Sequence, residues 1–113
     1  MHEMAIAQGV VEIALENASG HGAGKVLAIK VQAGEMTEVE PEALKFCFSV
    51  LAAGTAAEGA SLEIEVLPLA GRCRDCGYEF RVERFRFLCP DCDGAGVEIV
   101  SGRELRVEHL EVE

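Results

Sequence analysis

Cys73-Arg74-Asp75-Cys76 and Cys89-Pro90-Asp91-Cys92 are two C-x-x-C knuckles, with residues 77–88 between them. Zn²⁺ binds four thiolates in a tetrahedron, and each C-x-x-C turn presents two sulfurs to one side of such an ion. Four thiolates fill the coordination shell, so the ion has no open position for catalysis. The spacing therefore predicts a structural zinc site held by Cys73, Cys76, Cys89 and Cys92.

Other uses of paired cysteines fit the sequence less well, although one of them stays open. A secreted disulfide scaffold would show an apolar leader, whereas the chain begins Met1-His2-Glu3. A thioredoxin-like redox site needs one C-x-x-C at the start of a helix. Iron in a rubredoxin-like electron carrier stays open, because the same four thiolates bind iron or zinc. Free thiols arranged for a metal indicate a reducing cytoplasm.

Composition restricts the class of protein further. The 113 residues are enough for one domain, or for one domain with a small lobe held by a metal. The net charge of -10 argues against nucleic acid as the main partner, since phosphate contacts need a positive face. No apolar run approaches the roughly 18 residues of a membrane span. The sequence lacks a nucleophile elbow, a P-loop and the H-E-x-x-H zinc motif, so we expect no enzyme.

Hydrophobic periodicity outside the knuckles predicts two helices and three strands. Helical spacing runs from residue 4 to about residue 18, and Pro41 suits the first turn of a second helix. Strands are expected over residues 25–32, 61–67 and 104–112. In the last strand the alternation slips at His109-Leu110, which predicts a bulge or a frayed end. The side chains expected to face the core from the first two strands are Leu27, Ile29, Val31, Leu62, Ile64 and Val66.

The order of these elements predicts an α+β fold. We expect a two-layer domain in which two helices cover a three-stranded antiparallel sheet. A small zinc-ribbon lobe is inserted before the last strand. The α+β domain is expected to comprise residues 1–69 and 100–113, and the zinc lobe residues 70–99.

Met1-His2-Glu3 has a metal chemistry of its own. The bulky second residue is expected to keep the initiator methionine in place. The α-amine of Met1, the amide nitrogen of His2 and Nδ1 of His2 can then form fused chelate rings, in the planar nitrogen field that Ni²⁺ and Cu²⁺ favour. The fourth ligand stays open, because planar geometry resists using the Glu3 amide together with Nδ1 of His2. Protons compete for the amine and the imidazole, so the metal is exchangeable.

Four parts of the sequence together resemble a known family, namely Met1-His2-Glu3-Met4, residues 34–46, the four knuckle cysteines and residues 102–107. On these parts, and over essentially its whole length, the chain resembles the HypA/HybF family of hydrogenase maturation nickel chaperones. The resemblance implies that His2 is the nickel ligand, with the Met1 amine and Glu3 as its neighbours. Glu40 lies where family members carry an acidic residue proposed to assist nickel binding. Its alternative role is a solvated carboxylate that favours the dipole of the following helix.

The resemblance also implies a function. Family members deliver Ni²⁺ to the large subunit of [NiFe] hydrogenase together with a HypB-type GTPase, and some also support urease maturation. We therefore expect a structural Zn²⁺, a transported Ni²⁺ and a cytoplasmic location. We expect no nucleic-acid partner and no membrane partner. The alternative is a zinc-ribbon protein-interaction or nucleic-acid-binding module, for which the amino terminus would be dispensable.

The remaining conspicuous side chains receive structural interpretations. Cys47 is expected to be a small buried hydrophobe, His21 a solvated loop residue and His109 a structural residue. A basic and aromatic segment between the knuckles contains Arg81, Arg84, Phe85, Arg86 and Phe87. We expect its two phenylalanines to cover the zinc lobe and its arginines to face outward. Docking of a partner or of nucleic acid on this segment stays an alternative.

Overall fold

The computed structural model describes residues 2–22 and 24–113, so Met1 and its amine lie outside the described residues. The chain forms the helices α1 (Glu3–Gly20) and α2 (Pro41–Ala52) and the short 3₁₀ helix η1 (Glu35–Thr37). The strands form two sheets, with orders β2-β1-β6 and β4-β3-β5. The α+β class, both helices and the three long strands are thereby confirmed. The strands are β1 (Val26–Gly34), β2 (Ser61–Leu67), β3 (Ala70–Cys73), β4 (Glu79–Arg81), β5 (Val97–Ser101) and β6 (Leu105–Val112).

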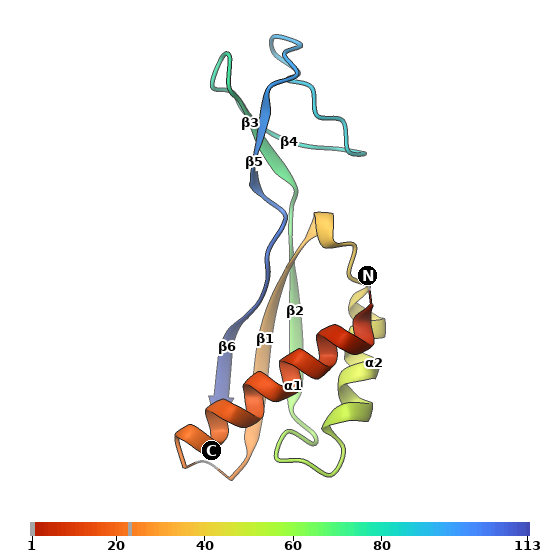
Figure 1. Ribbon diagram of the computed structural model, residues 1–113, viewed down its shortest axis with the longest axis vertical. Helices are drawn as coiled ribbons and strands as arrows, with labels where there is room; N and C mark the ends of the chain where they lie inside the picture. Colours follow the sequence, from red (N-terminus) through yellow and green to blue (C-terminus); the bar gives the residue numbers. More distant parts are fainter. Residues whose placement is uncertain (1, 23) are drawn as a thin grey trace.

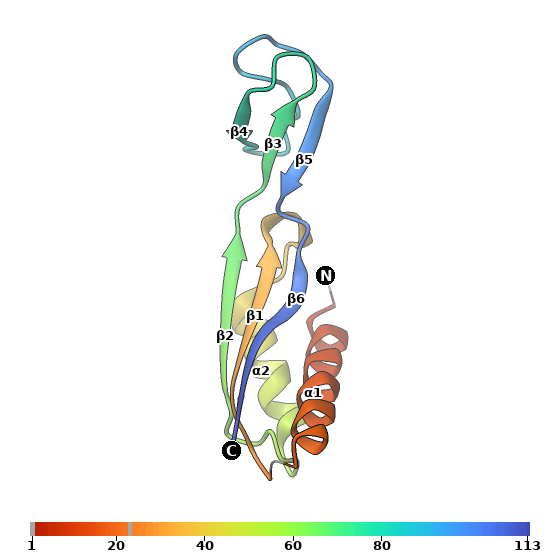
Figure 2. The same ribbon diagram turned by 90° about the vertical axis from the view of Figure 1, so that its left-hand side faces the viewer.

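The molecule is elongated, with extents of 55 × 25 × 16 Å. Both helices lie on one face of the larger sheet, and the small sheet stands beyond the end of that sheet (Figures 1 and 2). Strand β5 runs to Ser101 and so extends past residue 99, the expected end of the zinc lobe. In the described part of the chain, no helix is both long enough and apolar enough to cross a bilayer.

The larger sheet is mixed, so the prediction of an antiparallel sheet was wrong. Strand β1 pairs antiparallel with β6 but parallel with β2, where Ile29 lies opposite Leu62. Helix α2 lies in the connection from the end of β1 to the start of β2. A parallel pair needs such a crossover, because both strands must begin at the same end of the sheet. Alternation of apolar residues predicts which face of a strand is buried, but it carries no information on the direction of pairing.

The core lies between the two helices and the larger sheet, and two bulges decide which strand residues reach it. A register shift at Leu27 turns Val26 inward and leaves Leu27 44% exposed, against expectation. Val66, near the end of β2, is also exposed rather than inward. The predicted bulge in the last strand is confirmed at Glu108, where the register shifts again. The most deeply buried core residues include Val26, Ile29, Val31 and Leu44, each at most 2% exposed.

The two sheets meet at a tightly packed junction. The buried Leu69 donates its backbone N–H to Oε1 of Glu35 at 2.9 Å, and Arg81 donates to Oε2 of the same carboxylate at 3.2 Å. Gly102 has a φ of 114°, and a Cβ on it would lie 2.6 Å from Cα of Leu69. Sequence reasoning missed Glu35, because its partners lie 34 and 46 residues away along the chain.

Candidate metal centres

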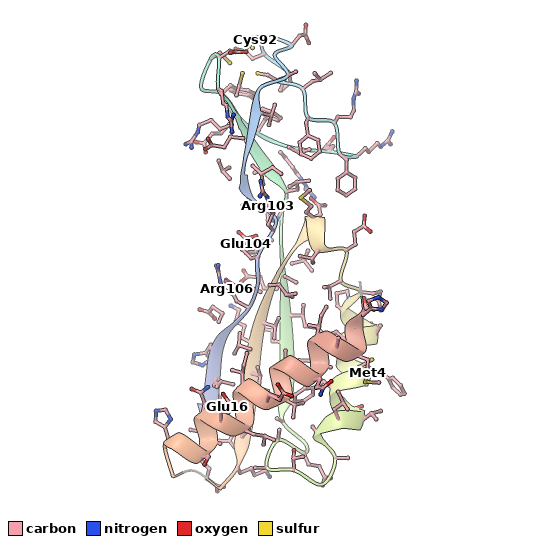
Figure 3. All side chains as sticks on the ribbon, viewed as in Figure 1. Met4, Glu16, Cys92, Arg103, Glu104 and Arg106 are labelled. Carbon is pink, nitrogen blue, oxygen red and sulfur yellow. The ribbon has the colours of Figure 1, made fainter. Side chains whose placement is uncertain are left out.

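The four cysteines of the two knuckles converge in the lobe that carries the small sheet. Their Sγ atoms all lie within 4.8 Å of one another, with 3.5 Å between Cys73 and Cys92 and 3.6 Å between Cys76 and Cys89. Metal–sulfur bonds of about 2.3 Å in a tetrahedron place the sulfurs about 3.8 Å apart. The cluster therefore fits one tetrahedral ion. Figure 3 shows Cys92 at the far end of the lobe.

The same backbone hydrogen bond closes each knuckle. Gly77 donates its N–H to the carbonyl of Cys73 at 2.9 Å, and Asp93 donates to the carbonyl of Cys89 at 2.8 Å. Both donors are in the left-handed region, with φ of 79° for Gly77 and 60° for Asp93. The sequence analysis missed the role of Asp93. The available signal was that Asp93 follows Cys89 by four residues, as Gly77 follows Cys73. Asp adopts the left-handed conformation more readily than most residues.

The surroundings of the thiols separate their acidities in the metal-free protein. The backbone N–H of Cys76, and after it that of Asp75, lowers the pKa of Cys73 to about 7. The N–H of Gly94 lowers the pKa of Cys92, but hydrogen bonds with the other thiols and desolvation outweigh it and raise this pKa to about 12. The pKa of Cys76 is also raised, by desolvation and neighbouring thiols acting against a backbone N–H. A metal ion that enters the cluster must therefore displace protons from Cys76 and Cys92.

The second candidate centre is the beginning of α1. His2 is the exposed N-cap residue, with extended backbone angles (φ -88°, ψ 92°). The first N–H groups of a helix have no partner within that helix, so the amide nitrogens of His2 and Glu3 are not used by α1. Oε2 of Glu3 accepts the backbone N–H of Glu40 at 3.1 Å, and this contact lowers the pKa of Glu3. The start of α1 is thereby fastened to the start of α2.

Glu40 is the N-cap residue of α2. Its carboxylate accepts the backbone N–H of Ala43 at 2.6 Å and that of Glu42 at 3.3 Å. The structure thus brings Glu3 and Glu40 together through the Glu40 backbone, while the Glu40 carboxylate is engaged by its own helix. This arrangement matches the alternative role of Glu40 at a helix start.

The other candidate residues lie outside both centres. His21 is exposed and holds a carbonyl of α1, and His109 is exposed beside a carboxylate of its own strand. Cys47 is partly buried and packs against the core. Phe85 is 48% exposed and Phe87 is partly buried, so the prediction that both rings cover the zinc lobe fails for Phe85. The reason is a left-handed backbone at Arg84 and Phe85, which holds this ring at the surface.

Comparison with known proteins identifies the family. A family model described as hydrogenase/urease nickel incorporation, metallochaperone, hypA matches residues 1–112. The hydrogenase maturation factor HypA of Desulfitobacterium hafniense (strain DSM 10664 / DCB-2) is 46% identical over 113 residues, which are 100% of this chain and 99% of that protein. The same factor of Geobacter sulfurreducens is 47% identical, with 100% of both chains covered.

A solved structure shares the fold. The solution structure of the nickel metallochaperone HypA from Helicobacter pylori is 24% identical and superposes with a TM-score of 0.70. The match covers 99% of this chain and 97% of that one. The full-length sequence matches and the four-cysteine cluster agree with this likeness. The chain therefore belongs to the HypA family of non-catalytic nickel metallochaperones for hydrogenase maturation.

Proposed function

We propose that this chain carries one Ni²⁺ at its amino terminus, held by the α-amine of Met1 and by the amide and imidazole nitrogens of His2. The contact between Glu3 and the backbone of Glu40 is the observation that carries this proposal, because it fixes the start of α1 beside an exposed His2. Loss of the amide proton leaves a negative charge, which the N-terminus of a helix stabilises. Ni²⁺ favours the resulting planar nitrogen field.

The two acidic neighbours have different parts in this proposal. The carboxylate of Glu3 orients the first turn through the Glu40 backbone, and the fourth nickel ligand stays open, because planar geometry resists adding the Glu3 amide to Nδ1 of His2. The Glu40 carboxylate is engaged in capping α2, so Glu40 acts as a positioning residue through Glu3. If the partner protein supplies the fourth ligand, it already contacts the nickel ion before the ion is transferred.

Delivery follows from the exposure of the site. An exchangeable ion at a chain end can pass to a partner that offers more ligands, and acid expels it because amine and imidazole bind protons. The family description names hydrogenase and urease. We assign the [NiFe] hydrogenase large subunit as the recipient and a HypB-type GTPase as the companion, with urease maturation as a further use. The reducing cytoplasm keeps the thiols competent for metal.

Cys73, Cys76, Cys89 and Cys92 are assigned to a structural Zn²⁺. Their sulfur separations and the matched backbone hydrogen bonds of the two knuckles support this assignment. When bound, zinc supplies folding free energy, about 10–16 kcal/mol in small finger peptides. In this proposal residues 1–69 and 100–113 form the nickel-binding unit and residues 70–99 the zinc unit, with β5 crossing the boundary.

A calorimetric Ni²⁺ titration of zinc-loaded, untagged protein tests the amino-terminal site. Intact-mass measurement first establishes that the chain begins with a free Met1. We expect one ion per chain in the wild type and no tight binding in His2→Ala. His21→Ala removes another exposed histidine and is expected to bind as the wild type does. Equal binding by wild type and His2→Ala would refute the site.

A further inference from the structure

The segment Arg81–Leu88, which we call the arginine loop, is strongly basic in an acidic chain. It holds three of the ten Lys and Arg residues and only one acidic residue, whereas the whole chain carries a net charge of -10. Arg81 is paired with Glu35. Among the described residues, no ion pair engages Arg84 or Arg86. Two guanidinium groups are therefore free to meet a carboxylate from another molecule.

The tip of the arginine loop is a strained turn. Arg86 donates its backbone N–H to the carbonyl of Glu83 at 3.0 Å, and the two residues between them have positive φ, 53° for Arg84 and 56° for Phe85. Turns with two such central residues are normally built from Gly, Asn or Asp. Bulky residues in this conformation cost free energy, and such strain concentrates at functional sites. The backbone strain at Arg84 and Phe85 thus coincides with an exposed phenyl ring.

The arginine loop also presents apolar surface on a fixed base. Val82 is buried and donates its N–H to the carbonyl of Leu69 at 2.8 Å, which anchors the start of the loop. Beyond that anchor Phe85 and Leu88 are about half exposed. Beside these two side chains, a groove of about 240 Å³ is lined by residues that include Phe80, Glu83, Arg86, Leu88, Pro90 and Asp93. Exposed aromatic side chains beside arginines are typical of protein–protein interfaces.

The arginine loop and the beginning of α1 project to the same side of the molecule in the view of Figure 1. Figure 3 labels Met4 at that beginning, and this side chain is 46% exposed. A protein seated on the arginine loop would therefore approach from the side on which α1 begins in the view of Figure 1.

We propose that the arginine loop is the docking surface for a partner protein that presents carboxylates around an apolar pocket for Phe85, and that this partner exchanges nickel with the chain. The exchange of nickel with this partner rests on the proposed function. Nucleic acid fits less well, because a chain with a net charge of -10 repels phosphates outside the loop. A second copy of the chain carries the same large negative charge, which opposes self-association.

Binding measurements with two proteins of the same organism test the docking surface. The immobilised probes are the [NiFe] hydrogenase large-subunit precursor and the HypB-type GTPase, and the full-length zinc-loaded chain is the analyte, with and without Ni²⁺. We expect Phe85→Ala and Arg84→Glu each to weaken binding to one probe at least about tenfold, with Arg84→Glu reducing the salt dependence. Zinc content and nickel stoichiometry stay at the wild-type values.

Two matched variants control for charge and apolar surface. Lys25→Glu reverses one exposed charge, and Leu27→Ala truncates one exposed apolar side chain at the start of β1; both are expected to bind within about twofold of the wild type. Unchanged binding of Phe85→Ala and Arg84→Glu to both probes would overturn the proposal, as would a wild type that binds neither. Effects confined to a single-stranded oligothymidine probe, or to self-association in sedimentation, would also overturn it. Failure of the amino-terminal site is read separately, in the nickel titration, because docking is also measured without nickel.

Discussion

Glu40 contacts the starts of both helices. Its carboxylate caps α2 while its backbone N–H holds Glu3 at the start of α1. Replacing an N-cap acceptor by alanine usually costs about 1 kcal/mol, so Glu40→Ala is expected to lower the free energy of unfolding by about that amount in urea titration. Glu40→Asp keeps an acceptor and is expected to retain most of it. Wild-type stability in Glu40→Ala together with lost nickel binding would instead make Glu40 a ligand.

The knuckle thiols carry a second prediction at this scale. Near pH 8 Cys73 is ionised, because its pKa is about 7. Cys92, with a pKa of about 12, and Cys76, whose pKa is raised, keep their protons. Zinc must displace them, so loading the metal-free protein at about pH 8 should release at least about two protons per ion. Calorimetry in two buffers of different ionisation enthalpy measures this number, and release of clearly fewer than about two protons would contradict the assigned acidities.

At the scale of the elements, hydrophobic periodicity predicted where the strands lie better than it predicted the direction in which they pair. Alternating Leu62, Glu63 and Ile64 predict β2 equally well whether it runs parallel or antiparallel to β1, so the mixed sheet could not be read from the pattern. The bulge in β6 could be predicted, because Val107 and Leu110 are apolar three residues apart. The bulge at Leu27 could not, since residues on both sides of it are apolar. Among site residues, the cysteine spacing was sufficient for the thiol cluster, whereas the capping role of Glu40 needed the structure.

The junction between the sheets predicts the effect of one substitution in a connecting segment. Gly102 and Gly59 both have positive φ, 114° and 78°, but only Gly102 lies where a Cβ would meet the Leu69 backbone. Gly59→Ala should therefore cost only the strain of a left-handed residue, about 1–2 kcal/mol. Gly102→Ala should destabilise the protein clearly more, because the backbones of two segments must separate. Equal losses in urea unfolding of the two variants would show that the junction is not tightly packed.

At the scale of the whole molecule, the orientation of the small sheet depends on Glu35. This carboxylate lies on η1, next to the larger sheet, and holds the Leu69 N–H and Arg81 of β4. No periodicity links such residues, which is why the sequence did not predict the contact. In this elongated molecule the Glu35 carboxylate thus holds two segments at the junction between the sheets, beside the packing of Gly102 against Leu69.

The Leu69 N–H, and after it Arg81, lowers the pKa of Glu35 below its usual 4.5. A carboxyl whose pKa is depressed by folding stabilises the folded state when ionised, and the contribution is lost as pH falls through the folded pKa. The junction should therefore loosen below about pH 4.5. Residual dipolar couplings near pH 7 should give one alignment tensor for both sheets of the wild type and two tensors for Glu35→Ala. Arg72→Ala, which breaks an ion pair to Glu98 within the small sheet, is the matched control and should keep one tensor. A single tensor in Glu35→Ala would mean that the Gly102 packing alone fixes the lobe.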